Sequence, residues 1–271
     1  GLLALHPDFA VSFRYVLAVA VVVGVVATAV QHVLYDASDD SFGDSVEGLS
    51  QLRSDLRSLP STLRPLLIGD TLVRFANGMV YVFFIIVVTE FLDVGLSLSL
   101  PGVGGVDLAP ATFFGLLLGV EMIVALLVMA PAAALAERVG LKPVVATGFA
   151  VYAIFPVLLI SAPPDAVVLT ALFAFSGLRF AGLPAHKALI VGPAKSDAGG
   201  RVTGAYYLLR NLIVIPSGAL GGALYGGLPN PFGAGQLIAG APTLAFAAAT
   251  VIGLVGTGYF LVAGEEFTAY Q

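Results

Sequence analysis

Residues 111–135 read ATFFGLLLGVEMIVALLVMAPAAAL, and Glu121 is the only ionisable residue in this run. An α-helix needs about 20 mostly apolar residues to cross the hydrocarbon core of a bilayer. The chain contains six further stretches of this kind, so the sequence predicts a helical membrane protein. We expect seven spans at Phe13–Val33, Leu66–Leu92, Ala111–Leu135, Val144–Ala162, Ala166–Val191, Val202–Gly226 and Leu244–Val262.

The composition of the whole chain supports a membrane location. Of its 271 residues 58% are hydrophobic and 11% are charged, whereas soluble domains carry about a quarter charged residues. The net charge of −5 argues against a nucleic-acid partner, which would need a basic face. The absence of cysteine excludes thiol catalysis and thiolate metal sites, and three scattered histidines give no metal-ligand spacing. We therefore expect no enzymatic activity, no cofactor and no metal.

The fold class predicted from these runs is all-α, because they are too long and unbroken for the alternating strands of an outer-membrane barrel. We expect three parts: residues 1–34 as one span, 35–65 as a connecting loop and 66–271 as a six-helix bundle. Within the loop, apolar residues recur at helical spacing before Pro60 and predict a short amphipathic helix. These residues are Val46, Leu49, Leu52, Leu56 and Leu59.

Basic residues in the loops predict the orientation, because they are retained on the cytoplasmic side of a membrane. The connections after spans two, four and six carry none. Those after spans one, three and five carry Arg53, Arg57, Arg64, Arg138, Lys142, Lys195 and Arg201. The chain should therefore place its C-terminus in the cytoplasm. We expect the lipid bilayer to be one of its partners.

The second span carries polar residues on one helical face. Asp70, Arg74, Asn77 and Tyr81 follow one another at i, i+4, i+7 and i+11. An ionisable residue at membrane depth is costly, so each is a candidate for binding a substrate or a proton. The alternative for Asp70 and Arg74 is mutual neutralisation along the helix.

Three further charges lie within spans, namely Glu121, Arg179 and Arg210. Glu121 must find a partner on another helix, contact water or stay protonated. Arg179 keeps its charge and needs an acceptor or a hydrated cavity. The fourth and seventh spans carry no Asp, Glu, Lys or Arg, so we expect them to face lipid. His186 lies near the end of its span, and Glu265 and Glu266 are expected in a solvated tail.

The segment Ala133-Ala-Leu-Ala-Glu-Arg-Val-Gly-Leu-Lys142 resembles the cytoplasmic loop signature of the major facilitator superfamily. That signature reads Gly-x-Leu-Ala-Asp-Arg-x-Gly-Arg-Arg/Lys, and Ala133, Glu137 and Leu141 depart from it. The resemblance assigns a cytoplasmic gate loop to Leu135, Glu137, Arg138, Gly140 and Lys142. It implies that Glu137 caps a helix of the other half of the transporter.

Two more segments resemble signatures of the same superfamily. Residues 179–185, RFAGLPA, are similar to the Arg-x-x-x-Gly signature of helix four and its repeat, one residue short. Residues 215–222, IPSGALGG, are similar to the Gly-Pro-x-x-Gly-Gly signature of helix five and its repeat. The resemblance implies that small residues here permit close packing and bending: Gly182, Pro216, Gly218, Gly221 and Gly222.

These resemblances imply that the seven spans correspond to helices six to twelve of a twelve-helix transporter, whose N-terminal half is missing. The implied function is secondary active transport of a small molecule by alternating access, coupled to H⁺ or Na⁺. Few lysines beside many arginines suggest a high-GC or salt-adapted prokaryote, whose inner membrane would hold the protein.

Two other classes of function stay open at this point. A seven-helix receptor, sensor or light-driven pump matches the number of spans, although the last span has no lysine for a retinal Schiff base. An intramembrane enzyme would need histidine or acidic residues clustered at depth.

Overall fold

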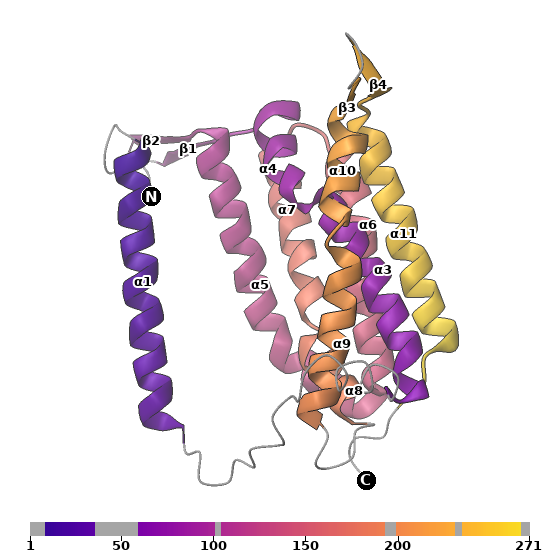
Figure 1. Ribbon diagram of the computed structural model, residues 1–271. Coiled ribbons are helices and arrows are strands. Elements are labelled where there is room, and N and C mark those ends of the chain that lie inside the picture. The colour runs from indigo at the N-terminus through magenta and orange to yellow at the C-terminus, as the bar shows by residue number, and fades with distance from the viewer. Residues whose placement is uncertain (1–8, 36–58, 101–103, 193–198, 231–234, 267–271) are drawn as a thin grey trace. The chain divides into compact units, whose positions relative to one another are not determined.

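The computed structural model describes residues 9–35, 59–100, 104–192, 199–230 and 235–266 (Figure 1). The chain divides into two compact units, residues 1–45 and 46–271. The described part of the first unit forms helix α1 (Phe9–Leu34). The amphipathic helix predicted before Pro60 lies outside the described residues, apart from Leu59, which is buried in the second unit.

The described residues contain seven helical stretches that are long and apolar enough to cross a membrane, as the sequence predicted. After α1, the remaining six belong to the second unit, and the first of these six begins with the short 3-10 helix η2 (Ser61–Leu63). They are α3 (Arg64–Val80) with η3 (Tyr81–Phe83), α4 (Phe84–Ile86) and η4 (Val87–Phe91); α5 (Pro110–Val139); α6 (Leu141–Ile160); α7 (Ala166–Gly177) with η5 (Leu178–Phe180) and α8 (Leu183–Val191); α9 (Gly199–Val214) with α10 (Ser217–Gly226); and α11 (Pro242–Ala263).

Three of these stretches change their helical form partway. The second passes from α3 through a 3-10 turn into the π-helical η4. The fifth is interrupted around Gly182, and the sixth is interrupted at Pro216, between α9 and α10. Proline removes a backbone donor and glycine lacks a Cβ atom, so such positions bend or break a helix.

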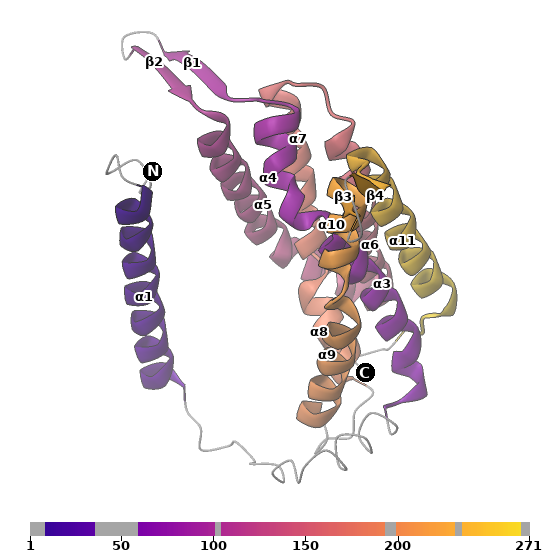
Figure 2. The same cartoon turned by 45° about the horizontal axis from the view of Figure 1, so that its top comes forward.

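The fold is mostly helical, as expected, but two of the connections form short β-hairpins that the expectation did not include. β1 (Leu96–Leu100) pairs antiparallel with β2 (Gly104–Leu108), and β3 (Gly227–Pro229) pairs with β4 (Gln236–Ala239). Both hairpins extend from the end of the helices opposite α8 (Figure 1, Figure 2). The sequence LSLSL of β1 alternates with period two, which is a strand signal that the all-α interpretation did not use.

Helix α3 packs closely against α11, and α6 also packs against α11. A Cβ atom on Gly69 of α3 would lie 2.7 Å from the Cβ of Phe260. One on Gly256 of α11 would lie 2.9 Å from the backbone oxygen of Gly69. Glycine at both positions lets the two backbones approach.

The expectation that the fourth and seventh spans face lipid is wrong for the fourth. Within its most apolar window α6 is 67% buried, the largest share among the seven spans, and α11 is 44% buried. The stretch from α9 to α10, which carries Arg210, is only 11% buried. The central, most buried helix of this bundle is therefore α6, although it spans the bundle without Asp, Glu or Arg at depth. The expectation failed because apolar side chains can pack against protein as well as against lipid.

Candidate functional site

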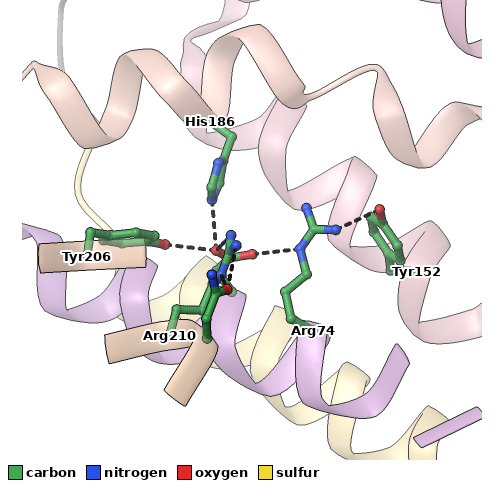
Figure 3. A network of polar contacts seen from close by, with 7 residues as sticks. Arg74, Tyr152, His186, Tyr206 and Arg210 are labelled. Carbon is green, nitrogen blue, oxygen red and sulfur yellow. Dashed lines mark hydrogen bonds and ion pairs between the residues drawn. The ribbon is translucent and has the colours of Figure 1, made fainter. Parts of the chain in front are cut away.

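The carboxylate of Asp70 is the centre of a buried polar cluster in the second unit. Figure 3 shows the side chains of Arg74, His186, Tyr206 and Arg210 pointing toward one another. Arg74 Nε lies 3.2 Å from Asp70 Oδ1. Arg210 Nη1 donates to Oδ2 at 3.1 Å, and the hydroxyl of Tyr206 donates to the same oxygen at 3.1 Å. His186 Nε2 lies 3.2 Å from Oδ2. Helices α3, α8 and α9 thus meet at one carboxylate.

Helical spacing explains how two of these helices supply their side chains. Asp70 and Arg74 are four residues apart on α3, and Tyr206 and Arg210 are four residues apart on α9. Residues at i and i+4 lie on the same helical face, so each helix presents a pair. We describe the five residues Asp70, Arg74, His186, Tyr206 and Arg210 as the Asp70 cluster.

Two guanidinium groups share one carboxylate in the Asp70 cluster. The side chain of Asp70 has no exposed surface, whereas those of Arg74 and Arg210 are 24% and 15% exposed. Positive charge is therefore in excess, and part of it is accessible from outside the bundle. Arg210 also donates from Nε and Nη2 to Asn211 Oδ1, at 3.1 and 2.9 Å.

Arg74 connects the Asp70 cluster to helix α6. Its Nη1 donates to the hydroxyl of Tyr152 at 2.8 Å. The guanidinium carbon lies 4.7 Å from the centroid of the same ring, a cation–π distance. The central helix α6 therefore takes part in the polar network.

A second buried ion pair joins α5 to η5. Arg179 Nη2 lies 2.8 Å from Glu121 Oε1, and both side chains are almost completely buried. The hydroxyl of Ser176 donates to the same oxygen of Glu121. Of the possibilities open for Glu121, the structure places it beside a partner on another helix.

Aromatic rings surround the guanidinium of Arg179. Its carbon lies 4.8 Å from the ring centroid of Phe180, 4.9 Å from that of Tyr152 and 5.8 Å from that of Tyr81. Arg179 Nε is buried and makes no hydrogen bond to a described residue. Tyr152 therefore contacts both Arg74 and Arg179, and it links the two ion-pair networks.

A small cavity lies between the two networks. Its volume is about 10 Å³, which is about the space of one water molecule. Its polar walls come from Arg74, Tyr152, Arg179 and His186.

The other two residues of the predicted polar face are more peripheral. Tyr81 is 49% exposed and lies beyond the end of α3, where its ring meets the edge of Phe84. Asn77 is half-buried. The structure therefore brings Asp70, Arg74 and Arg210 into one cluster, and Glu121, Arg179 and the ring of Tyr81 into another.

The predicted gate loop is almost entirely helical. Helix α5 continues to Val139 and α6 begins at Leu141, so Gly140 alone separates them. Its φ of 97° and ψ of 164° belong to a region that is essentially restricted to glycine. Leu135, Glu137 and Arg138 are exposed on the last turns of α5.

Glu266 occupies the start of α6. Its carboxylate accepts a hydrogen bond from the backbone N–H of Leu141 at 2.6 Å, and two from that of Lys142 at 3.0 and 3.3 Å. In return Lys142 Nζ donates to the carbonyl of Gly264 at 2.7 Å. Glu266 is exposed, as expected for a solvated tail, and it also caps α6, because unpaired N–H groups at a helix start attract a carboxylate.

The predicted packing residues differ in how closely they are approached. A Cβ atom on Gly221 would lie 1.8 Å from the backbone oxygen of Met79, and one on Gly182 would lie 3.1 Å from that of Val144. A Cβ atom on Gly218 would have its only neighbour within 4 Å at 3.9 Å, and one on Gly222 would have no neighbour within 4 Å. Pro216 lies at the break between α9 and α10.

Sequence reasoning missed four members of these networks: Tyr152, Ser176, His186 and Tyr206. The i, i+4 spacing of Tyr206 and Arg210 was available as a signal, since it repeats that of Asp70 and Arg74. His186 gave no local signal, because only the interruption before α8 and the packing of α3 bring it to Asp70.

Comparison with protein-family models gives no match for this chain, and comparison with curated proteins gives none either. Among the residues that the structure describes, no group of three or more His, Asp or Glu side chains is placed to hold a metal ion. The function therefore has to be inferred from the residues of the two networks.

Proposed function

We propose that this chain is part of a secondary active transporter that moves a small molecule across a membrane by alternating access, coupled to H⁺ or another ion. The observation that carries the proposal is the pair of charged networks between helices of membrane-spanning length. The Asp70 cluster joins α3, α8 and α9, and the Glu121–Arg179 pair joins α5 and η5.

The energetic reason for a transport function is the cost of these charges. Moving one ionisable side chain to the centre of a bilayer costs about 2.5–3.5 kcal/mol on insertion scales. Five such residues lie in this bundle: Asp70, Arg74, Glu121, Arg179 and Arg210. A purely structural bundle gains more from apolar packing than from buried ion pairs, so a set of this size indicates a polar ligand or ion.

The partly exposed guanidinium groups of Arg74 and Arg210 suggest where the pathway runs. Exposed positive charge at membrane depth is unstable against lipid, so this face of α3 and α9 requires water or another polar surface. A second bundle across an aqueous cavity would supply both. Repeated bundles with a binding site between them are a common architecture of secondary transporters.

The resemblance to the major facilitator superfamily agrees with this placement. It would make the second unit the C-terminal bundle of a twelve-helix transporter and α1 the last helix of the N-terminal half. The pattern of basic loop residues would place the α8 end of the bundle, and the C-terminus, in the cytoplasm of a prokaryotic cell.

Transport by the full-length protein in proteoliposomes tests the proposal. A panel of small carboxylates, phosphate esters, neutral sugars and cationic compounds is added outside vesicles that carry a pH gradient. We expect accumulation of one class, strongly reduced in Arg179→Ala and in Glu121→Gln. Arg201→Ala is the matched control, because Arg201 is exposed at the start of α9.

The proposal fails if both network variants transport at the wild-type rate. It also fails if residues 1–271 alone sustain gradient-driven transport, because half of the pathway would then be unnecessary. Size-exclusion profiles of each variant show whether a loss of transport reflects misfolding.

A further inference from the structure

An apolar groove lies between α5, α6 and η5, and none of its lining residues belongs to either ion-pair network. Its volume is about 300 Å³. Thr147 is the one lining residue with a polar side-chain atom, and its hydroxyl donates to the carbonyl of Pro143 at 2.9 Å. We call this space the α5–α6 groove; its walls include Val128, Ala132 and Val139 of α5, Pro143 and Thr147 of α6, and Leu178 of η5.

Short side chains leave the α5–α6 groove open. Pro131 and Ala132 on α5, Pro143 on α6 and Ala181 after η5 carry no long chain that could fill it. Empty apolar space loses dispersion contacts, and water has no polar partners there. The groove is therefore suited to hydrocarbon that comes from outside the chain.

The α5–α6 groove opens toward the outside of the bundle. Leu135 and Val139 on its wall are 50% and 52% exposed. Pro131, Pro143 and Thr147 are exposed as well. A contiguous exposed apolar surface of this kind marks a contact with membrane or protein.

The groove starts where the chain turns between two spans. Helix α5 ends at Val139 and α6 begins at Leu141, so the chain reverses at Gly140. Between two helices of membrane-spanning length, such a reversal lies at a membrane surface. Val128 and Val139 line the groove eleven positions apart, which is about 16 Å along a helix axis. One leaflet contributes about 15 Å of hydrocarbon, so the groove has the depth of one leaflet.

The width of the groove distinguishes a lipid chain from a helix. A volume of about 300 Å³ over about 16 Å corresponds to a mean width of about 5 Å. An α-helix with its side chains is about 10–12 Å across, so a further helix does not fit inside. A hydrocarbon chain is about 4–5 Å across, because non-bonded carbon atoms approach to about 4 Å. The groove therefore matches one hydrocarbon chain in length and width.

A cationic side chain lies at the surface end of the groove. Arg138 is exposed on the last turn of α5, next to Val139 and three positions after Leu135. It makes no ion pair or hydrogen bond to any residue within the described ranges. The neighbouring acid, Glu137, lines a different pocket together with Pro184. A guanidinium group binds two phosphate oxygens at once, so Arg138 is suited to a phosphate at the membrane surface.

We propose that the α5–α6 groove binds one chain of an anionic membrane lipid and that Arg138 holds the phosphate of its headgroup. The hydrocarbon fills the space that the short side chains leave, and the guanidinium pairs with a charge that stays at the surface. This lipid site is separate from both ion-pair networks, and it does not depend on the proposed transport function.

Tryptophan fluorescence of the full-length protein in vesicles tests the lipid site. Residues 1–271 contain no tryptophan, so an introduced one reports its own surroundings once the wild-type signal is subtracted. Leu135→Trp probes the groove wall. Leu127→Trp is the matched control, because Leu127 is 69% exposed on the same helix and does not line the groove. The vesicles contain phosphatidylcholine with increasing fractions of phosphatidylglycerol whose chains are brominated, because bromine quenches tryptophan on contact.

We expect phosphatidylglycerol to quench Leu135→Trp as a lipid bound about fivefold more strongly than phosphatidylcholine, about the factor that one basic residue near a membrane surface contributes. In Leu127→Trp the two lipids should bind equally. Adding Arg138→Gln to Leu135→Trp should remove the preference. Adding Arg201→Gln should leave it unchanged, because Arg201 is exposed at the start of α9 and does not line the groove.

The same measurements contain the results that would overturn the lipid site. An equal preference in Leu127→Trp would show a general effect of lipid charge, and a preference that survives Arg138→Gln would exclude this arginine as the headgroup partner. An absence of quenching by either lipid in Leu135→Trp would show that protein covers the groove. Should Leu135→Trp not fold, Val139→Trp replaces it.

A soluble headgroup separates a lipid site from a site for free phosphate esters. Glycerol phosphate at constant ionic strength should leave the quenching by phosphatidylglycerol unchanged, because it carries no chain for the groove. Displacement of the lipid by glycerol phosphate would overturn the proposal.

Discussion

Replacing Glu266 by alanine tests how the end of α11 holds the start of α6. The carboxylate accepts three contacts from two backbone N–H groups that have no partner within α6. Loss of a capping side chain costs about 0.5–2 kcal/mol, typically about 1 kcal/mol. A local free-energy loss of about 1–2 kcal/mol raises the population of the opened state by a factor of about 5–30. We therefore expect the amides of Leu141 and Lys142 to exchange at least about fivefold faster in Glu266→Ala.

Hydrogen exchange followed by mass spectrometry, on the protein in lipid nanodiscs, measures this effect on the peptide that spans Gly140. Glu265→Ala is the matched control, because it removes the same charge from the neighbouring position. Its side chain is exposed and makes no hydrogen bond or ion pair to the residues that the structure describes. Equal exchange in Glu266→Ala and the wild type, or an equal increase in Glu265→Ala, would refute the capping role.

Three further substitutions test the packing and the polar links by thermal unfolding in detergent. Gly256→Ala places a methyl group 2.7 Å from a side-chain carbon of α3, and Gly258→Ala, with nothing within 4 Å, is its control. Both variants gain about 1 kcal/mol from alanine in a helix, but only Gly256→Ala has the overpacking cost of about 1–3 kcal/mol. Gly256→Ala should therefore be less stable than Gly258→Ala by about 2 kcal/mol. Equal stability of the two variants would contradict the close approach of α11 and α3. Tyr152→Phe loses the hydroxyl that accepts a 2.8 Å hydrogen bond from Arg74 and should lower the free energy of unfolding by about 1 kcal/mol. Its control is Tyr259→Phe, on an exposed ring, which should cause no measurable change. Gly140→Ala forces a side chain into a glycine-only conformation at a cost of about 1–3 kcal/mol, and an unchanged melting temperature would rule out that backbone geometry.

The spans were predictable because the signal for a membrane-length helix is local. Each needs only a run of apolar residues, and the predicted Val144–Ala162 lies within two to three residues of α6 at either end. The hairpin formed by β1 and β2 was predictable in principle from the alternation in LSLSL. It was missed because a preference for helices was extended into the connections between them.

The polar clusters were predictable only in part. The pair of Asp70 and Arg74 follows from their spacing on one helix. The meeting of Glu121 with Arg179, from positions 58 residues apart, does not follow from any local pattern. The sequence showed that each of these charges needs a partner, and the packing of α5 against α7 and η5 supplies it.

The sequence by itself determined that the chain is helical and lipid-compatible and which helices carry charge, because composition and helical periodicity are properties of each segment alone. Only the tertiary structure decided that α6 is central, that His186 belongs to the Asp70 cluster and that Glu266 caps α6. These features depend on which helical faces meet. An apolar face packs against lipid and protein alike, so hydrophobicity alone does not distinguish the two, whereas buried charges and unpaired N–H groups have few partners that satisfy them.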